Sequence, residues 1–309
     1  MYLSCSLTKR GIAGSHLALG TAAAPKNGDP LVEVMGRWQK AVEGTPSKSW
    51  VRAIDLYGGG IWKELRTEHA ALRRGGVEIR IVSAGLGLLA PDNLVPAYDA
   101  TFAPGAANAI SGPRGAVQRN RDWWSLLNQW PGPWTGPRSL HATVKKYRQS
   151  THIIALPAAY MAAVLGDLDA LLRDEEGLAR TIVLATPTSA AVRRMPRVVD
   201  VSGDLYRALG GTRGTVLARA GLFLAKKLHR RAADVELAAA TLKPLRAHIR
   251  PFPVRTGKTD DQVSRFIQSA LRKNSDLTAS PLLARFRRAG FACEQTRFRK
   301  LHTAVKNNL

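Results

Sequence analysis

The sequence predicts an α/β fold, in which short buried strands alternate with helices around a largely parallel sheet. Three apolar runs carry this prediction: residues 79–82, 153–156 and 181–186. Each run is too short for a typical helix, and a helix-length segment separates each from the next. Runs that are apolar at nearly every position are typical of strands covered on both faces. We therefore expect a parallel sheet at the centre of a three-layer core.

Further elements follow from the same patterns. Residues 1–6, MYLSCS, predict a first strand, and 197–202 predict another late in the core. Helices are expected over 31–43 and, in two pieces broken by three glycines, between residues 50 and 75. The Trp-rich stretch 122–134 has Trp123, Leu126, Leu127 and Trp130 at helical spacing. This spacing favours a buried core or lid over an exposed platform for stacking bases.

The charge of the chain points to a polyanionic partner. The 309 residues include 46 Lys and Arg against 23 Asp and Glu, a net charge of +23. Residues 204–309 hold 22 basic and 7 acidic residues, so most of the excess lies in the last third. The basic residues are mostly arginines scattered through folded-looking sequence, which favours nucleic acid over a solubility surface or a membrane-surface patch.

Several classes of protein are not expected. No apolar run approaches the 18 residues of a membrane span, and the start of the chain lacks the pattern of a signal peptide, so we expect a cytoplasmic protein without membrane contact. Two cysteines, Cys5 and Cys293, are too few for a disulfide framework and lack metal-ligand spacing. Neither a metal nor a cofactor is predicted.

The segment RPFPVRTGK, residues 250–258, predicts a linker between a core of residues 1–250 and a tail of residues 258–309. The tail contains three helical patterns and a dense set of basic side chains. A helix-turn-helix-like DNA-binding extension is one interpretation, and a basic helical cap on the core is the other. On the first interpretation the candidate contacts to the DNA backbone are Arg287, Arg288, Arg297 and Arg299.

The strand at 79–82 runs into SAGLGLLAPDNLVPAYDATF, a loop rich in glycine, proline and acids. Chemistry in open α/β sheets gathers where strands end in loops. Its candidate residues are Ser83, Gly85, Gly87, Asp92, Tyr98 and Asp99. A solvated surface loop is the alternative. Other candidates are Trp62, as a base-stacking side chain or a core residue, and Lys9, Arg10 and Arg213, as contacts to phosphate.

The segments CSLTKRG, LYGGGIWKEL, SAGLGLLAPDNLVPAYDATF, LGGTRGTVLAR and ASPLLARFRRAGFACEQTRF resemble the motifs of an uncharacterised bacterial family. That family is similar to the YaaA and archaeosine-synthase lyase folds, which resemble the uracil-DNA glycosylase fold. Some relatives are anti-phage DNA glycosylases that excise glucosylated hydroxymethylcytosine. The water-activating loop of uracil-DNA glycosylase, with its Gln, Asp, Pro, Tyr and His, is absent here.

The resemblance implies a uracil-DNA glycosylase-like core and a glycosylase that acts on a modified base in double-stranded phage DNA. Asp99 or Asp92 is then expected to activate water, and Tyr98 to stack on or orient the base. Ser83, Gly85, Gly87, Cys5, Ser6 and Trp62 are expected near the base. The alternatives are a 7-deazaguanine-type transglycosylase or lyase on nucleic acid, and a DNA-binding protein without catalysis.

Overall fold

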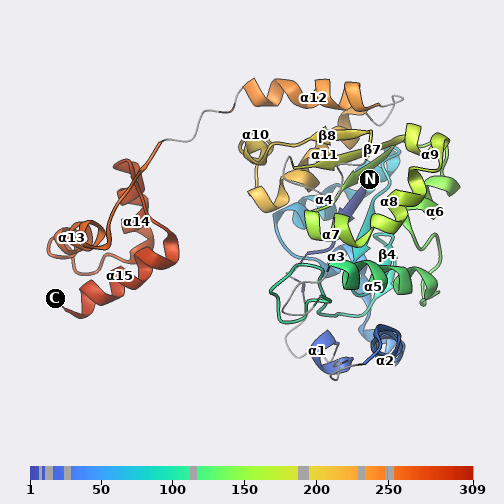
Figure 1. The fold of residues 1–309 in the computed structure, drawn as a ribbon, viewed down its shortest axis with the longest axis horizontal. Helices are drawn as coiled ribbons and strands as arrows, with labels where there is room; N and C mark the ends of the chain where they lie inside the picture. The colour runs from blue at the N-terminus through green and yellow to red at the C-terminus, as the bar shows by residue number, and fades with distance from the viewer. Residues whose placement is uncertain are drawn as a thin grey trace. The chain divides into compact units, whose positions relative to one another are not determined.

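The chain folds into two compact units, Met1–Ile249 and Arg250–Leu309, each with its own apolar core (Figure 1). The structure is a computed structural model that describes residues 1–6, 9–10, 17–23, 29–111, 117–186, 195–228, 234–247, 249 and 254–308. Residues 7–8, which follow the predicted first strand, and residues 250–253 of the predicted linker lie outside this part. The boundary between the units falls at the start of that expected linker.

The first unit is mixed α/β and is built on a six-stranded, mostly parallel sheet. The strands lie in the order β4-β3-β1-β6-β7-β8, and only β4 is antiparallel to its neighbour. Their bounds are β1 Tyr2–Ser4, β3 Arg80–Ser83, β4 Gly87–Leu89, β6 His152–Ala155, β7 Thr181–Ala185 and β8 Val198–Asp200. The five parallel strands overlap the runs that the sequence predicted as strands, and β3 and β6 are each displaced by one residue.

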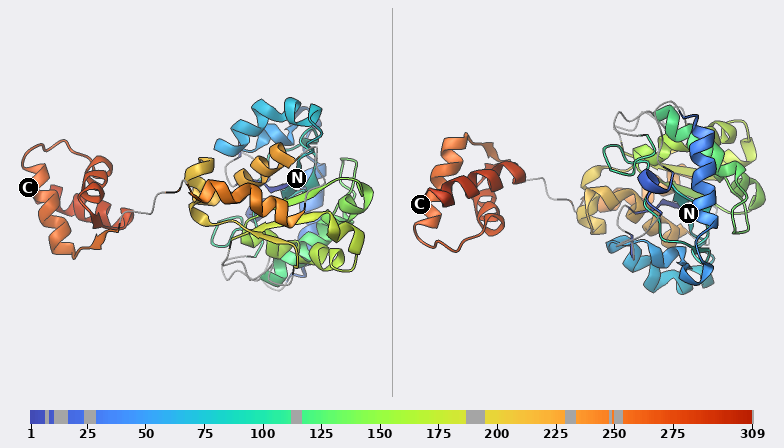
Figure 2. Two further views of the ribbon diagram at one scale, coloured as in Figure 1. Left: turned by 90° about the horizontal axis from the view of Figure 1, so that it is seen from above. Right: turned by 90° about the horizontal axis from the view of Figure 1, so that it is seen from below.

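Helices pack against the sheet. Helix α11 (Val216–Leu228) packs on β6 and β7 and contacts α4 (Gly60–Arg74). Helix α5 (Val117–Gln129) packs on β4 and on α7 (Ala158–Ala163). Figure 2 shows α4 on the opposite side of the sheet from the green helices. The other helices in the described part of this unit are α1 Leu19–Ala22, α2 Leu31–Glu43, α3 Ala53–Leu56, α6 Leu140–Lys146, α8 Leu165–Leu171, α9 Glu175–Ala179, α10 Tyr206–Leu209 and α12 Val235–Ala247, with 3-10 turns η1 Ser47–Ser49, η3 Gly203–Leu205 and η4 Arg213–Thr215.

The central loop differs from its prediction because it contains a strand. After β3, the chain turns at Ala84–Leu86 and returns as β4, with Ser83 opposite Gly87. Gly87 has φ of +79°, which favours glycine at the start of the returning strand. A second short pair joins β2 (Val51–Arg52) to β5 (Leu94–Val95). The hairpin carries the chain back to the amino end of β3, so the acids of the loop become separated in space.

The Trp-rich stretch belongs to the core, as favoured from its spacing. Trp123, Trp124, Trp130 and Trp134 are all buried. The Trp123 indole N–H donates to the Ala84 carbonyl at 2.8 Å, and the Trp124 indole N–H donates to Asp167 at 3.0 Å. Trp123 therefore supports the turn after β3 and Trp124 is bonded to α8, and neither indole is exposed to a base.

The second unit contains α13 (Asp260–Leu271), α14 (Ala279–Arg288) and α15 (Gln295–Asn307). Two-residue strands β9 (Thr256–Gly257) and β10 (Phe291–Ala292) pair in parallel. The core gathers around Phe286, whose ring lies 4.9 Å from Phe266 and 5.6 Å from Phe298 between centroids. Helix α14 ends before Gly290 (φ +85°). In neither unit is any helix within the described ranges long and apolar enough to cross a membrane.

Candidate functional site at the carboxyl ends of the parallel strands

The strand order marks one place in the sheet as a natural ligand site. From β1 the chain crosses to β3 on one side, whereas β6, β7 and β8 follow one another on the other side. The direction of winding therefore reverses between β1 and β6. Open α/β sheets bind ligands outside the carboxyl ends of the strands at such a switch point. The residues that follow β1, β3 and β6 lie at this edge of the sheet.

Buried polar side chains meet at this edge. The Tyr98 hydroxyl lies 2.7 Å from Ser83 Oγ and 3.0 Å from the Tyr57 hydroxyl. Beside them, the Tyr160 hydroxyl lies 3.1 Å from Cys5 Sγ and 3.3 Å from Thr101 Oγ1. Burial, followed by the neighbouring Cys5, raises the pKa of Tyr57, Tyr98 and Tyr160 well above the usual range of a tyrosine. The three phenols are therefore neutral hydrogen-bonding groups near pH 7.

Asp99 lies at the rim of this cluster and is held on both carboxylate oxygens. The Asn108 amide donates to Asp99 Oδ2 at 2.6 Å, and Lys9 Nζ lies 3.9 Å from Oδ1. Asn108 is itself fixed, because its Oδ1 accepts the Gly20 N–H at 2.9 Å. The Lys9 side chain has no exposed surface, whereas 35% of the Asp99 side chain is exposed. The carboxylate is therefore fixed by two side chains and remains partly exposed to solvent.

The backbone of Asp99 is also fixed. Its N–H donates to the Leu17 carbonyl, and its carbonyl accepts the Leu19 N–H. Beneath it, the Tyr98 ring packs so closely against Gly85 that a Cβ there would lie 2.6 Å from the ring. The Gly85 carbonyl in turn accepts the Trp38 indole N–H at 2.6 Å. Glycine at position 85 is needed for this close approach, and the residues next to Asp99 are tightly packed.

Tyr98, predicted to stack on the base, has no exposed surface. The ammonium of Lys9 lies 4.6 Å from its ring centroid, and Gly85 and Trp38 occupy its edges. Gly85 and Gly87 are buried as well, and Gly87 pairs with Ser83 inside the hairpin. The structure thus places Tyr98 and Gly85 in the packed layer beside Asp99 and Gly87 inside the hairpin, and none of the three is exposed to a base.

The other predicted base-binding residues are also mostly enclosed. Cys5 and Ser83 are buried within the phenol cluster, and Ser6, which follows Cys5, is half-buried. Trp62 is 3% exposed, and its ring lies 4.9 Å from that of Tyr57 between centroids. Trp62 is thus a core residue beside the cluster, which was the alternative interpretation of its sequence position.

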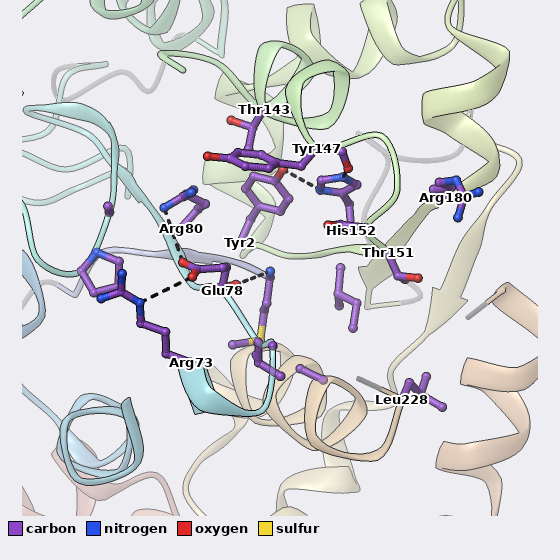
Figure 3. Close-up of a pocket in the computed structure, with 18 of the residues that line it drawn as sticks. Tyr2, Arg73, Glu78, Arg80, Thr143, Tyr147, Thr151, His152, Arg180 and Leu228 are labelled. Atoms are coloured by element: carbon purple, nitrogen blue, oxygen red, sulfur yellow. Dashed lines mark hydrogen bonds and ion pairs between the residues drawn. The ribbon is translucent and has the colours of Figure 1, made fainter. Parts of the chain in front are cut away.

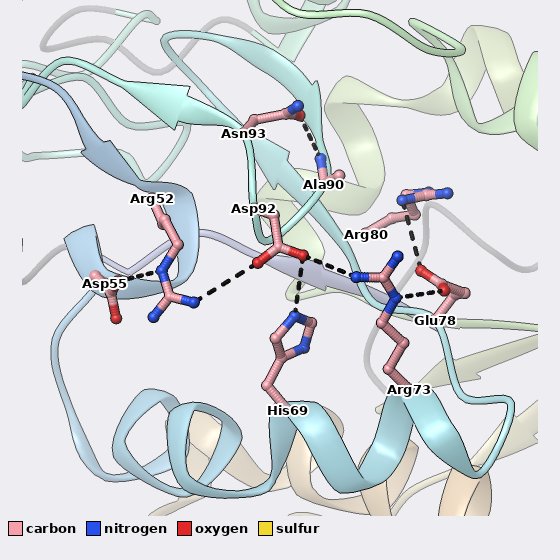
Figure 4. Close-up of polar contacts among 9 residues, drawn as sticks. All are labelled: Arg52, Asp55, His69, Arg73, Glu78, Arg80, Ala90, Asp92 and Asn93. Atoms are coloured by element: carbon pink, nitrogen blue, oxygen red, sulfur yellow. Dashed lines mark hydrogen bonds and ion pairs between the residues drawn. The ribbon is translucent and has the colours of Figure 1, made fainter.

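Asp92 lies at the opposite end of the sheet from Asp99. Because β4 runs antiparallel to β3, the residues after β4 return to the amino ends of the parallel strands. There Asp92 contacts His69 and Arg73, each at 3.4 Å, and Arg52 at 3.8 Å (Figure 4). The two acids that the sequence placed in one loop therefore do not share a site. Asp92 has the geometry of a surface ion-pair network.

A cavity of about 820 Å³ opens beside this network, at the amino ends of β1, β3 and β6 (Figure 3). One wall carries Arg73, Glu78 and Arg80, and Tyr2 and His152 lie on another. Tyr2 donates its hydroxyl to His152 Nδ1 at 2.9 Å, and His152 Nε2 donates to the Tyr147 carbonyl at 3.1 Å. Burial lowers the pKa of His152 to about 4, so this wall is neutral near pH 7. The cavity carries both charge signs, and its lining includes the candidate Asp92 but not Asp99 or Tyr98.

The predicted contacts to the DNA backbone in the first unit divide into two groups. Lys9 is enclosed under Asp99, so its predicted contact with phosphate is not available in this arrangement. Arg10 and Arg213 are exposed. Arg213 begins η4, immediately before α11, where Thr212 and Thr215 form a reciprocal capping box. Arg10 and Arg213 thus retain the exposure that contact with a polyanion requires.

Of the four predicted tail arginines, two form contacts within the second unit and two are exposed. Arg297 contacts Asp260, with Nε 2.7 Å from Oδ1, and donates to the Lys258 carbonyl at 2.9 Å. Arg287 donates to the Cys293 carbonyl at 3.0 Å. Arg288 and Arg299 are exposed. Two of the four predicted side chains therefore hold the second unit together, and two are presented at its surface.

Sequence reasoning missed Tyr57, Thr101, Asn108 and Tyr160. Tyr57 and Tyr160 come from segments 41 and 62 residues away from Tyr98, so only the crossovers of the sheet bring them together. Tyr160 has one available signal, since it follows a predicted strand by a few residues. No sequence signal identifies Asn108. It lies in an irregular segment, and the path of that segment is set by its backbone pairing with Thr101.

Comparison of the chain with models of protein families, with curated proteins and with solved structures gives no match. Among the residues that the structure describes, no group of three or more His, Cys, Asp or Glu side chains is arranged to hold a metal ion. The interpretation of the site therefore depends on its own geometry.

Proposed function

We propose that this protein is a DNA glycosylase, which hydrolyses the N-glycosidic bond of a modified base and leaves an abasic site. The observation that carries the proposal is the Asp99 carboxylate at the switch point of the sheet. It is fixed by Asn108 and Lys9 and is open over about a third of its side chain.

The chemistry of this bond requires such a group. When the base departs with the bonding electron pair, positive charge grows on the sugar, and a fixed carboxylate stabilises that charge. The same carboxylate accepts a proton from the water that forms the new bond to the sugar carbon. The departing base takes its proton from solvent. Lys9 and Asn108 hold one Asp99 oxygen each, so the carboxylate does not have to reorganise during the reaction.

Two further features support nucleic acid as the substrate. The chain has a net charge of +23, and Arg10 and Arg213 are exposed on the same unit as Asp99. The proposal includes the uracil-DNA glycosylase-like assignment of the core, with which a mostly parallel sheet is compatible. The choice of glucosylated hydroxymethylcytosine in phage DNA, and hence a role in antiviral defence, comes from the motif resemblance.

The geometry favours hydrolysis over a lyase reaction. A lyase that acts through an amine requires that amine to reach the sugar carbon. Among the described residues, Lys9 is the lysine that contacts Asp99, and its side chain is fully enclosed between Asp99, the Ala100 carbonyl and the Tyr98 ring. Its position suits a fixed positive charge that orients Asp99.

The test is Asp99→Asn, which keeps the size of the side chain and removes its charge. We expect release of the base from modified phage DNA, measured by mass spectrometry and by an assay for abasic sites, to fall by about a hundredfold or more. DNA binding is expected to change little. Unmodified DNA gives the background for both measurements.

Asp92→Asn is the matched control, because the same chemical change is made at the opposite end of the sheet. This variant is expected to release base at the wild-type rate. If Asp99→Asn is as active as the wild type, or if Asp92→Asn loses as much activity, then Asp99 is not the group that assists the reaction.

A further inference from the structure

The second unit concentrates positive charge, and its acids lie away from one of its helix faces. Residues 250–309 contain 13 Lys and Arg against 4 Asp and Glu, a net charge of +9. Three of the four acids gather at helix amino ends. Asp260 and Asp261 begin α13, and Glu294 caps α15 by accepting the N–H groups of Thr296 and Arg297. Asp276, the fourth, lies in the turn between α13 and α14.

Helix α15 is sharply two-sided. Phe298 and His302 are buried, and Leu301 and Val305 are half-buried against the same core. His302 is also fixed, since its Nε2 lies 2.9 Å from the Leu277 carbonyl oxygen. The opposite face is exposed and is formed by Arg299, Lys300, Thr303, Lys306 and Asn307. These positions recur at intervals of three and four residues, which places them on one side of a helix. We refer to these five residues as the outer face of α15.

The cations of the outer face differ from Arg287 and Arg297 of the same unit. Arg297 and Arg287 are committed to contacts that hold the fold together. Arg299, Lys300 and Lys306 form no ion pair within the described part of the chain, and no acid lies among the five residues of the face. Three exposed positive charges on one helix face, accompanied by Thr and Asn, match a surface that presents regularly spaced phosphates and hydrogen-bonding groups.

We propose that the protein binds duplex DNA through the outer face of α15, which lies in the major groove. A helix of 13 residues is roughly 20 Å long, and the major groove of B-DNA, about 12 Å wide, admits a helix. The amino end of α15 is capped by Glu294, whose negative charge repels phosphate. The middle and last turns, with Arg299, Lys300, Thr303 and Lys306, therefore form the contact.

The arrangement differs from the tight turn of a typical helix-turn-helix. Six residues, 289–294, separate α14 from α15, and they include β10, which pairs with β9. This pairing and the Phe286 core fix the orientation of α15 within the unit. The binding face is thus a rigid helix surface rather than a loop.

The test uses the full-length chain and a 30-base-pair duplex without modified bases, so that binding is measured without catalysis. The binding variant carries Arg299→Gln, Lys300→Gln and Lys306→Gln. The control carries Arg265→Gln in α13 and Arg272→Gln and Lys273→Gln directly after it, which removes three exposed cations away from α15. Both variants lose the same net charge, so a general loss of electrostatic attraction affects them equally.

Dissociation constants are measured by fluorescence anisotropy across a series of salt concentrations. Each phosphate contact contributes about 0.9 to the slope of log K against log salt, so the binding variant is expected to lose about 2.7 from the slope. The control is expected to lose less than one contact. Equal losses in the two variants, or an unchanged slope in the binding variant, would overturn the proposal.

The groove is tested separately, by competition with a major-groove dye and with a minor-groove ligand. Displacement by the major-groove dye alone is the expected result, and displacement by the minor-groove ligand alone would overturn the assignment. This inference is independent of the proposed reaction. If the protein binds DNA through α15 but releases no base, only the glycosylase proposal is contradicted. If the protein releases base and the triple Gln variant of α15 binds DNA as the wild type does, only the proposal for α15 is contradicted.

Discussion

At the scale of single residues, His152 is held in its neutral form by its neighbours. Tyr2 donates to Nδ1 and the Tyr147 carbonyl accepts from Nε2, so both ring nitrogens are satisfied by the neutral imidazole. A proton added to Nδ1 takes the place of the Tyr2 hydrogen bond and places a charge in a ring that is 5% exposed. Burial accordingly lowers the pKa of His152 to about 4.

This lowered pKa predicts a loss of stability in mild acid. The unfolded chain binds the His152 proton near pH 6.5, whereas the folded chain binds it near pH 4. Neutral His152 therefore contributes fully to the free energy of unfolding above pH 6.5. This contribution, about 3 kcal/mol in total, is lost as the pH falls from 6.5 to 4. Urea unfolding at a series of pH values measures it. His152→Gln should flatten the curve between pH 6.5 and 5, and an equally steep curve in that variant would contradict the prediction.

In the candidate site, the sequence allows Asp99 to be predicted but not the residues that contact it. Asp99 was identified because it follows a glycine-rich loop after a strand, and acids in such positions are commonly functional. Its partners Lys9 and Asn108 were not predicted as partners, because a buried Lys–Asp contact between residues 90 positions apart depends on the packing of three segments. Asp92 was considered together with Asp99 since sequence proximity was the only measure of distance.

At the scale of elements, hydrophobic periodicity predicted the long helices and the parallel strands. The predicted helix at 31–43 coincides with α2, because Val34, Met35, Trp38 and Val42 recur on one buried face. Strand β4 was missed. Its three residues, Gly87–Leu89, are too few to show a period, and the glycines around them predict a loop. One missed hairpin was sufficient to misplace Asp92.

The amino end of α13 provides a test at this scale. Thr259 Oγ1 accepts the Gln262 N–H, and Gln262 Oε1 accepts the Thr259 N–H at 3.2 Å. Thr259→Ala removes one half of this capping box and should lower the free energy of unfolding of the second unit by about 1 kcal/mol. Hydrogen exchange of the α13 amides measures the change.

Thr303→Ala is the control for that measurement, since it makes the same substitution on the exposed face of α15, where alanine favours the helix. It is expected to leave the protection of α13 unchanged. Equal effects of the two substitutions would show that the Thr259 cap does not contribute.

At the scale of the whole molecule, the two units have separate cores and different charge densities. Residues 1–249 carry 33 basic and 19 acidic side chains, a net of +14, so removal of residues 250–309 takes away +9 of the total of +23. The truncated chain should remain folded, bind duplex DNA more weakly and show a shallower dependence on salt.

Circular dichroism and anisotropy on the truncated and full-length chains measure these effects. Base release from modified DNA by the truncated chain should recover when its concentration is raised, because Asp99 and its partners all belong to the first unit. An unchanged salt slope in a folded truncated chain would contradict the assignment of the second unit to DNA binding.

The two edges of the central sheet have a consequence for behaviour at high concentration. An edge strand with free amides is a template on which another chain can add a strand and begin an aggregate. Here β4 and β8 are only three residues each. The Arg138 guanidinium donates to the Leu86 carbonyl beside β4, and Arg246 donates to the Asp200 carbonyl of β8 at 2.6 Å. Both edge strands are short, and arginine side chains occupy a carbonyl at or beside each of them. The folded sheet therefore offers little template for extension into fibrils.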